Sequence, residues 1–257
     1  MGNLFFALET HAPWPENFPA GRVLDEEARH LTLAFLGNAP LEKALEIAQE
    51  LEAPFAVGKA ALIDRLVFLP ERHPHVAAYH FELLQDLSPY AANLVQRCLQ
   101  AGLTPSHPDR PLLNHITIAR EPRDFKAWKE TFIPLPCYLG DLHLYESLGA
   151  SKYRSHYRIK VRPPFEEIPH TADIAFHIWG ETPEQLHLGA LLALGFHYPP
   201  VFGWPTPQHD LTEIIIALNA QIAETDAESG CPFKAVSFHG EIVETEGLLH
   251  WEMIVDV

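Results

Sequence analysis

The chain has 257 residues, of which 47% are hydrophobic, and a formal net charge of −16. This length and this hydrophobic fraction fit a globular protein of one large or two modest domains, and no apolar run approaches the roughly 18 residues of a membrane-spanning helix. The three cysteines form no CxxC pair and the start of the chain has no signal-peptide pattern, so we expect no cysteine zinc site and a reducing, cytoplasmic location.

The charge is divided unevenly along the chain. Residues 1–164 carry 17 Lys and Arg against 19 Asp and Glu, whereas residues 165–257 carry one basic residue, Lys234, against 15 acidic residues. Prolines cluster at the junction, as in a stiff extended connection. We therefore predict two domains, 1–164 and 165–257, with different partners. The second domain lacks the cations that an RNA backbone requires.

Hydrophobic periodicity predicts alternating strands and helices in the first domain. A period of two predicts strands at 3–9, 30–36, 57–69, 75–83, 115–120, 138–146 and 155–161. Apolar residues at helical spacing predict a helix over 41–51. A second helix is expected to have Ser88 as its N-cap and Gly102 after its end, and a third to begin near Phe125. This pattern is typical of an α+β domain, which we expect to have two related, duplicated lobes around a central cleft.

The second domain also mixes strands and helices. A strand is expected to end at Gly180, and Thr182 with Pro183 reads as the cap and first turn of a helix. A second helix is expected over 211–222. Closing strands are predicted at 233–238, 241–244 and 249–257. These elements predict a small α+β fold.

Two short segments of the first domain repeat one pattern. The sequence HLTLA starts at His30 and the sequence HITIA starts at His115. Residues i and i+2 of a strand share a face, so His30 is expected to point with Thr32, and His115 with Thr117. The alternating apolar residues Leu31, Leu33, Phe35, Ile116 and Ile118 are expected to enter a core.

Two imidazoles and two hydroxyls in one cleft would suit acid–base chemistry on a phosphodiester without a metal. Histidine titrates near neutrality, so one ring can be neutral while the other is protonated. Thr32 and Thr117 can donate hydrogen bonds to phosphate oxygens. Arg120 closes the second segment and is expected to share the His115 face and contact phosphate, the alternative being a solvated arginine at a strand end. A single His-x-Thr could also be an ordinary polar position on a sheet.

These segments resemble the two signatures of the two-histidine (2H) phosphoesterases, in particular the bacterial and archaeal RNA 2′,3′-cyclic phosphodiesterases once described as RNA ligases acting on tRNA halves. The likeness extends to LFFAL at Leu4 and LYES at Leu144, and covers about residues 2–160. It implies cofactor-free hydrolysis of RNA 2′,3′-cyclic phosphate ends to 2′-phosphates. By this resemblance one histidine protonates the departing O3′ and the other activates water. We assign the acid to His30 and the base to His115, an order that the sequence leaves open.

Other residues of the first domain could contact RNA. Candidates to guide the RNA backbone are Arg22, Arg110, Lys152, Arg154 and Arg158. Each could equally be a solvated surface charge. Tyr153 could stack on a base or serve in packing. The spacing of His73, His75 and His80 matches no specific metal motif, and we interpret them as loop or strand histidines.

The second domain carries a different resemblance. HTADIAFHIWG, from His170, and the final residues IVDV resemble archease, a small acidic protein that assists the GTP-dependent RNA ligase of tRNA splicing. The likeness implies a Ca²⁺ or Mg²⁺ site formed by Asp173, Asp256 and the carboxylate of Val257, with that ligase as partner. On the residues alone, Asp173 could instead cap a turn and Asp256 could be a solvated tail.

Three functions stay open at this point. The leading hypothesis is an RNA 2′,3′-cyclic phosphodiesterase with an archease-like module. The alternatives are a non-catalytic protein that binds RNA ends for the ligase, and a phosphodiesterase for small cyclic nucleotides. A pure binder has no need for two titrating groups, which favours an enzyme.

Overall fold

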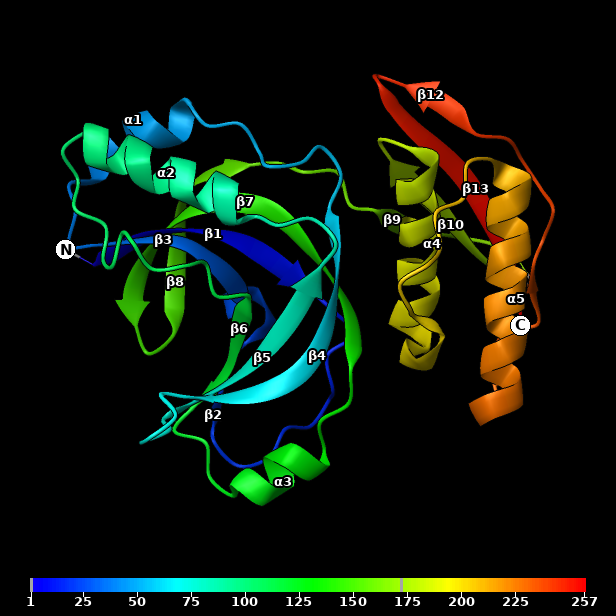
Figure 1. Ribbon diagram of the computed structural model, residues 1–257, viewed down its shortest axis with the longest axis horizontal. Coiled ribbons are helices and arrows are strands. Elements are labelled where there is room, and N and C mark those ends of the chain that lie inside the picture. Colours follow the sequence, from blue (N-terminus) through cyan, green and yellow to red (C-terminus); the bar gives the residue numbers. More distant parts are fainter. Residues whose placement is uncertain (1, 172) are drawn as a thin grey trace.

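The computed structural model describes residues 2–171 and 173–257, and within them the strands form two antiparallel sheets (Figure 1). Met1 and Ala172 of the HTAD segment lie outside the described residues. The strands of the first sheet are β1 (Asn3–His11), β2 (Arg22–Val23), β3 (His30–Gly37), β4 (Lys59–Leu69), β5 (Val76–Leu83), β6 (His115–Arg120), β7 (Leu135–Gly149) and β8 (Lys152–Ile159). Each predicted strand is present within a few residues of its expected ends, and the short β2 is an addition that the pattern did not reveal.

The first sheet curls until its two ends approach each other. Its strand order is β2-β6-β5-β4-β7-β1-β3, with β8 paired to β7, so β3 and β6 lie near opposite ends. Nevertheless β3 contacts β6. The curl therefore brings the two His-x-Thr strands together, although they lie far apart in the sequence.

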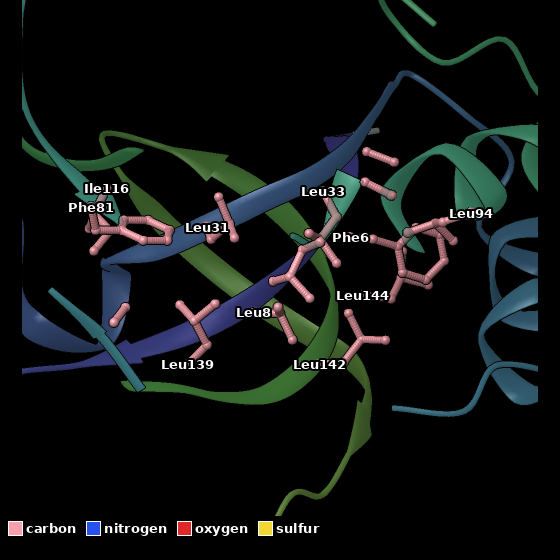
Figure 2. Close-up of a cluster of buried hydrophobic side chains, with 14 of the residues drawn as sticks. Phe6, Leu8, Leu31, Leu33, Phe81, Leu94, Ile116, Leu139, Leu142 and Leu144 are labelled. Atoms are coloured by element: carbon pink, nitrogen blue, oxygen red, sulfur yellow. The ribbon is translucent and has the colours of Figure 1, made fainter. Parts of the chain in front are cut away.

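Large apolar side chains from both parts of the curled sheet form its core. Figure 2 shows Phe6 and Leu8 of β1 beside Leu31 and Leu33 of β3, with Leu94 of a covering helix nearby, and all five are buried. Burial of each such side chain stabilises the fold by about 1.5–3 kcal/mol. The inward faces of the His-x-Thr strands are thus fixed by core packing, and their polar residues are left on the other face.

A β-bulge interrupts the expected alternation at the same position of both motifs. The register of β3 on β1 shifts at Leu33, and that of β6 on β5 shifts at Ile118. One extra residue reverses the face taken by every side chain that follows. The prediction that Phe35 enters the core is therefore wrong: it is 38% exposed and lines the same cavity as Thr32.

The described residues of the first sheet's region also form three helices, α1 (Leu41–Gln49), α2 (Ser88–Gln100) and α3 (Phe125–Glu130). The 3-10 turn η1 (Glu26–Ala28) precedes β3. The expectation that Ser88 caps α2 is wrong by one position, since Leu87 is the cap residue. The Asp86 carboxylate accepts a hydrogen bond from the Ser88 backbone N–H at 2.8 Å. This N–H at the start of the helix has no partner within the helix, so Asp86 provides one. Gly102 follows α2 with a φ of +74°, a conformation that favours glycine.

The second sheet is smaller and carries the C-terminal helices on one side. Its strands are β9 (Phe165–Ile168), β10 (Ile174–Gly180), β11 (Ala235–Val236), β12 (Val243–Thr245) and β13 (Leu248–Asp256), and its helices are α4 (Pro183–His197), η2 (Pro199–Val201) and α5 (Leu211–Ser229). Thr182 caps α4 as predicted, its hydroxyl accepting the Gln185 N–H at 3.4 Å. Asp210 caps α5 in the same way and accepts the Glu213 N–H at 2.9 Å.

Helix α4 lies between the two sheets and joins their cores (Figure 1). Almost every residue from Leu186 to Gly195 is buried, as expected of a helix that is apolar all round. A Cβ at Gly195 would approach Pro136 of β7 to 3.0 Å, so glycine permits this close packing. Ala60 of β4 belongs to the same buried cluster. In the part of the chain that the structure describes, no helix is both long and apolar enough to cross a membrane.

Candidate active site

Each candidate catalytic histidine is held by the backbone two residues before it. His30 Nδ1 lies 2.8 Å from the Ala28 carbonyl oxygen, and His115 Nδ1 lies 3.0 Å from the Leu113 carbonyl oxygen. A carbonyl oxygen only accepts, so Nδ1 donates the hydrogen in both rings. In the neutral rings the lone pair is therefore on Nε2, which can accept a proton and later return it.

Buried Arg29 fixes the chain just before His30. Its Nε and Nη2 atoms donate to the Leu24 carbonyl oxygen at 3.2 and 2.9 Å, and its guanidinium lies 4.7 Å from the centre of the Trp14 ring. The Thr10 hydroxyl donates to the Arg29 carbonyl oxygen at 3.0 Å. The sequence analysis did not identify Arg29, because nothing in the residue type distinguishes a buried positioning arginine from a surface one.

Aromatic rings pack around His30. The His30 ring centre lies 5.0 Å from that of Phe5, 6.0 Å from that of Tyr145 and 5.0 Å from that of Tyr153, which meets it edge-on. Tyr153 also meets Phe5 edge-on at 5.3 Å. Tyr153, a candidate for base stacking, therefore forms part of the wall that shields His30 from water.

Electrostatics connect His30 to the opposite strand. Burial lowers the pKa of His30 to about 4; the hydrogen bond to Ala28 opposes this change, and the positive charges of His115 and Arg120 add to it. Strict alternation would place Arg120 on the face opposite His115, but the bulge at Ile118 returns it to the histidine face. The structure therefore brings His30, His115 and Arg120 together.

His115 opens into a cavity of about 660 Å³ between β3 and β6. Thr32 and Phe35 line this cavity from β3, and the loop before β6 forms another wall. Thr117 is partly buried on β6, two residues beyond His115 and before the bulge. Neither Thr117 nor His30 is part of the described lining, so the cavity lies to one side of the histidine pair.

The surroundings of His115 are more polar than those of His30. Burial lowers the pKa of His115, the hydrogen bond to Leu113 opposes this, and the positive charges of Arg110 and His80 lower it further. His80 pairs with His115 across β5 and β6, and its ring contacts the Asp64 carboxylate. Arg110 lines the 660 Å³ cavity, and is thus placed to contact an anion bound there.

Two other arginines proposed to guide RNA are paired with carboxylates instead. Arg154 lies 3.8 Å from Glu146, and Arg158 donates to Asp141. Arg22 lies opposite Arg120 across β2 and β6 and adds a second positive charge beside that residue. The positive charge near the histidines thus comes from the loop before β6 and from β2 and β6.

The predicted metal ligands of the second sheet lie near one another, and a lysine contacts one of them. Asp173 precedes β10 and Asp256 ends β13, so both carboxylates lie at the same end of paired strands. The Asp173 backbone N–H donates to His170 Nδ1 at 3.3 Å. The Lys234 ammonium donates to the terminal oxygen of Val257. A cationic side chain therefore already neutralises the carboxyl terminus that was expected to be a ligand.

No protein-family model matches the sequence, and no curated protein is similar to it. Solved structures do resemble the fold. A structure described as a phosphoesterase is 24% identical, over 63% of this chain and 98% of its own, with a TM-score of 0.44. Escherichia coli LigT complexed with 3′-AMP is 24% identical over 62% of this chain and 98% of its own, with a TM-score of 0.44. TT0787 of Thermus thermophilus is 21% identical over 63% and 98%, with a TM-score of 0.46. At this level of similarity, the function of this chain has to be inferred from its own side chains.

Proposed function

We propose that the chain is a phosphodiesterase that hydrolyses the 2′,3′-cyclic phosphate of RNA ends to a 2′-phosphate. The observation that carries this proposal is the histidine pair. His30 and His115 lie on β3 and β6, which contact each other across the curled sheet, and both rings present the same tautomer. The charge of His115 lowers the affinity of His30 for a proton. Cleavage of a cyclic phosphodiester by water needs one group that accepts a proton and one that donates a proton, and this pair provides both.

The difference in pKa favours His30 as the base. With a pKa of about 4, His30 is neutral at pH 7 and can take a proton from water as the water oxygen bonds to phosphorus. Burial also lowers the pKa of His115, but a bound phosphate anion would raise it. His115 then gives its proton to O3′ as the P–O3′ bond breaks. This order is the reverse of the one first assigned from the sequence, which left it open.

Charges and hydroxyls around the pair suit the phosphate group. Arg120 acts electrostatically on His30 and Arg110 acts on His115, so an anion between the histidines meets a positive charge on each side. We expect Thr32 and Thr117 to donate to the non-bridging oxygens. In a site with little water these charge-assisted contacts stabilise the pentacoordinate transition state more than in bulk solvent.

The size of the substrate distinguishes the leading proposal from its alternatives. A cavity of about 660 Å³ is within the range of small-ligand sites, so a cyclic mononucleotide is a possible substrate by volume. Arg22 lies opposite Arg120 on β2, and Arg110 lines the cavity from the loop before β6. Both extend the positive charge beyond one phosphate, which favours an RNA end.

The test compares 2′,3′-cyclic AMP with a tRNA half that ends in a 2′,3′-cyclic phosphate. The proposal predicts a 2′-phosphate product from both, with a higher kcat/KM for the RNA. Equal kcat/KM values would favour the small-nucleotide alternative. Binding of RNA without hydrolysis would identify a non-catalytic accessory protein, and absence of both would contradict the assignment.

For residues 165–257 we propose a docking role on a basic face of a GTP-dependent RNA ligase, as the archease resemblance implies. The supporting observation is the charge of 15 acidic residues against Lys234 alone. The full chain should speed ligase guanylylation, the effect should weaken as salt rises, and Asp173→Ala should reduce it. If the wild-type chain does not change the guanylylation rate of the ligase, the proposed docking role is wrong.

A further inference from the structure

A second cluster of titratable side chains lies in the first sheet, outside the phosphate site. Glu9 of β1 and Asp141 and His143 of β7 present ligand atoms that all lie within 4.8 Å of one another. His11 Nε2 lies 3.4 Å from the second carboxylate oxygen of Glu9. Glu9, His11 and His143 line a cavity of about 890 Å³, which differs from the one at His115. The proposed hydrolysis uses none of these groups.

The hydrogen bonds of His143 leave its Nε2 atom beside a carboxylate. The Ser155 hydroxyl donates to the Tyr157 carbonyl oxygen at 3.2 Å, so it accepts from His143 Nδ1, which lies 2.7 Å away. In the neutral ring Nε2 then has no hydrogen, and it lies 2.8 Å from Glu9 Oε1. Two lone pairs at this distance repel each other unless a cation lies between them.

A proton alone does not account for this arrangement. His143 is 4% exposed, and among the described residues its Nε2 atom forms no hydrogen bond with acceptable geometry, even though Glu9 is so near. An imidazolium N–H that served the carboxylate would point at it. The buried nitrogen therefore lies within ion-pair distance of Glu9 but forms no aligned hydrogen bond with it.

The carboxylates of the cluster have oxygen atoms that can serve as ligands. Glu9 Oε1 lies 2.8 Å from His143 Nε2, and Glu9 Oε2 lies 3.4 Å from His11 Nε2. Asp141 accepts from Arg158 and from the Val161 N–H, the latter at 2.7 Å. A carboxylate offers about four lone-pair positions, so these two bonds leave Asp141 able to contribute.

We propose that Glu9, Asp141 and His143 bind a divalent transition metal of the Zn²⁺ type. Imidazole and carboxylate are ligands that such ions prefer, at metal–ligand distances of about 2.0–2.2 Å. Ligand atoms around one ion are then about 3–4.4 Å apart. The distances in this cluster extend from 2.8 Å, between His143 Nε2 and Glu9 Oε1, to at most 4.8 Å, so small side-chain shifts would fit the three ligands to one ion. The Ser155 hydroxyl orients the His143 ring, as outer hydrogen-bond partners do in metal sites.

The ion would tie together the strands that form the wall beside His30. Glu9 and His143 belong to the paired strands β1 and β7, and Ser155 to β8. Tyr145 stacks on His143 with ring centres 4.6 Å apart and also lies against His30. The site is structural and separate from the hydrolytic step, so it stands or fails independently of the proposed function.

Calorimetric titration of chelator-treated, full-length protein with Zn²⁺ tests this proposal. The wild type should bind one ion tightly, and Glu9→Gln, which keeps shape but removes charge, should weaken that binding at least tenfold. His143→Gln should also weaken the binding. If this substitution of a buried residue prevents folding, the Glu9→Gln variant still tests the proposal. His209→Gln is the matched control, since this exposed ring also contacts a carboxylate, that of Glu184.

Thermal unfolding gives a second measurement that does not depend on activity. The wild-type Tm should rise with added Zn²⁺ because the ion binds the folded state, and the Tm of Glu9→Gln should not. Equal Zn²⁺ affinity in the wild type and Glu9→Gln would assign the binding to surface histidines and overturn the proposal. Absence of saturable binding to the wild type would do so as well.

Discussion

Strands β3 and β6 carry the same motif in different surroundings. Both have the bulge at the fourth motif position and the Nδ1 hydrogen bond to the carbonyl two residues earlier. His30, however, is packed among Phe5, Tyr145 and Tyr153, whereas His115 opens into a cavity near charged side chains. The local sequence determines how each ring is oriented, and the neighbours from other strands determine how readily it takes a proton.

This asymmetry is the means by which two identical side chains can divide acid and base roles. Each pKa unit between them corresponds to about 1.4 kcal/mol in relative proton affinity. A pair with equal pKa values would share the proton and hold the reactive arrangement only part of the time. The aromatic wall around His30 therefore contributes to the proposed chemistry as much as the motif does.

The largest predicted effect comes from removing either member of the pair. His30→Ala and His115→Ala should each lower turnover by a factor of about 10²–10⁴. The turnover of the double variant should be only slightly below that of the less active single variant, because the two rings act as one unit. Steady-state hydrolysis of a 2′,3′-cyclic phosphate in the presence of EDTA provides the measurement, with His75→Ala on an exposed loop as control. Wild-type turnover in either single variant would exclude that histidine from the reaction.

A smaller effect is expected from the threonines. Thr32→Val and Thr117→Val keep the side-chain shape and remove one hydroxyl each. A hydrogen bond to a charged group contributes about 1.5–3 kcal/mol, so each change should lower kcat/KM by about 10–10²-fold. Circular dichroism should show an unchanged fold. If both variants retain the wild-type kcat/KM, the threonines serve only in packing.

The smallest predicted effect is a shift in the pH dependence of kcat/KM, and it should differ between substitutions near His30 and substitutions near His115. If His30 is the base and His115 the acid, kcat/KM rises as pH increases through the pKa of His30 and falls as pH increases through that of His115. Arg120→Met removes a positive charge that lowers the pKa of His30, so the acidic limb should move to higher pH. Arg110→Met should move the alkaline limb to higher pH. If both variants move the same limb, the two arginines do not act on separate histidines.

Much of this site follows from sequence pattern, and the exceptions have physical reasons. Period-two alternation gives the strands and the shared face of His30 and Thr32, because core packing of the intervening leucines enforces it. Alternation fails at Phe35 and at Arg120, since one bulge residue reverses the faces and leaves no mark in composition. Contacts that depend on distant strands escape sequence analysis altogether, as the Glu9 contact with His143 does.

The prediction for the second region depends on a resemblance and not on alternation. Asp173 and Asp256 do lie at one end of paired strands, as an archease-like metal site requires. Lys234 nevertheless occupies the carboxyl terminus that would complete it. Lys234 reaches Val257, 23 residues further along the chain, because β11 pairs with β13. Local sequence pattern does not show this pairing.

The pKa values of His30 and His115, measured by NMR titration of the free protein, test the asymmetric pair most directly. Single His→Gln variants assign the two resonances. Burial is expected to lower the pKa of His30 to about 4 and to hold the pKa of His115 below its ordinary value of 6.5. The proposed roles require His115 to titrate at a higher pH than His30. Titration of both rings near pH 6.5, or of His30 above His115, would contradict the division of roles between them.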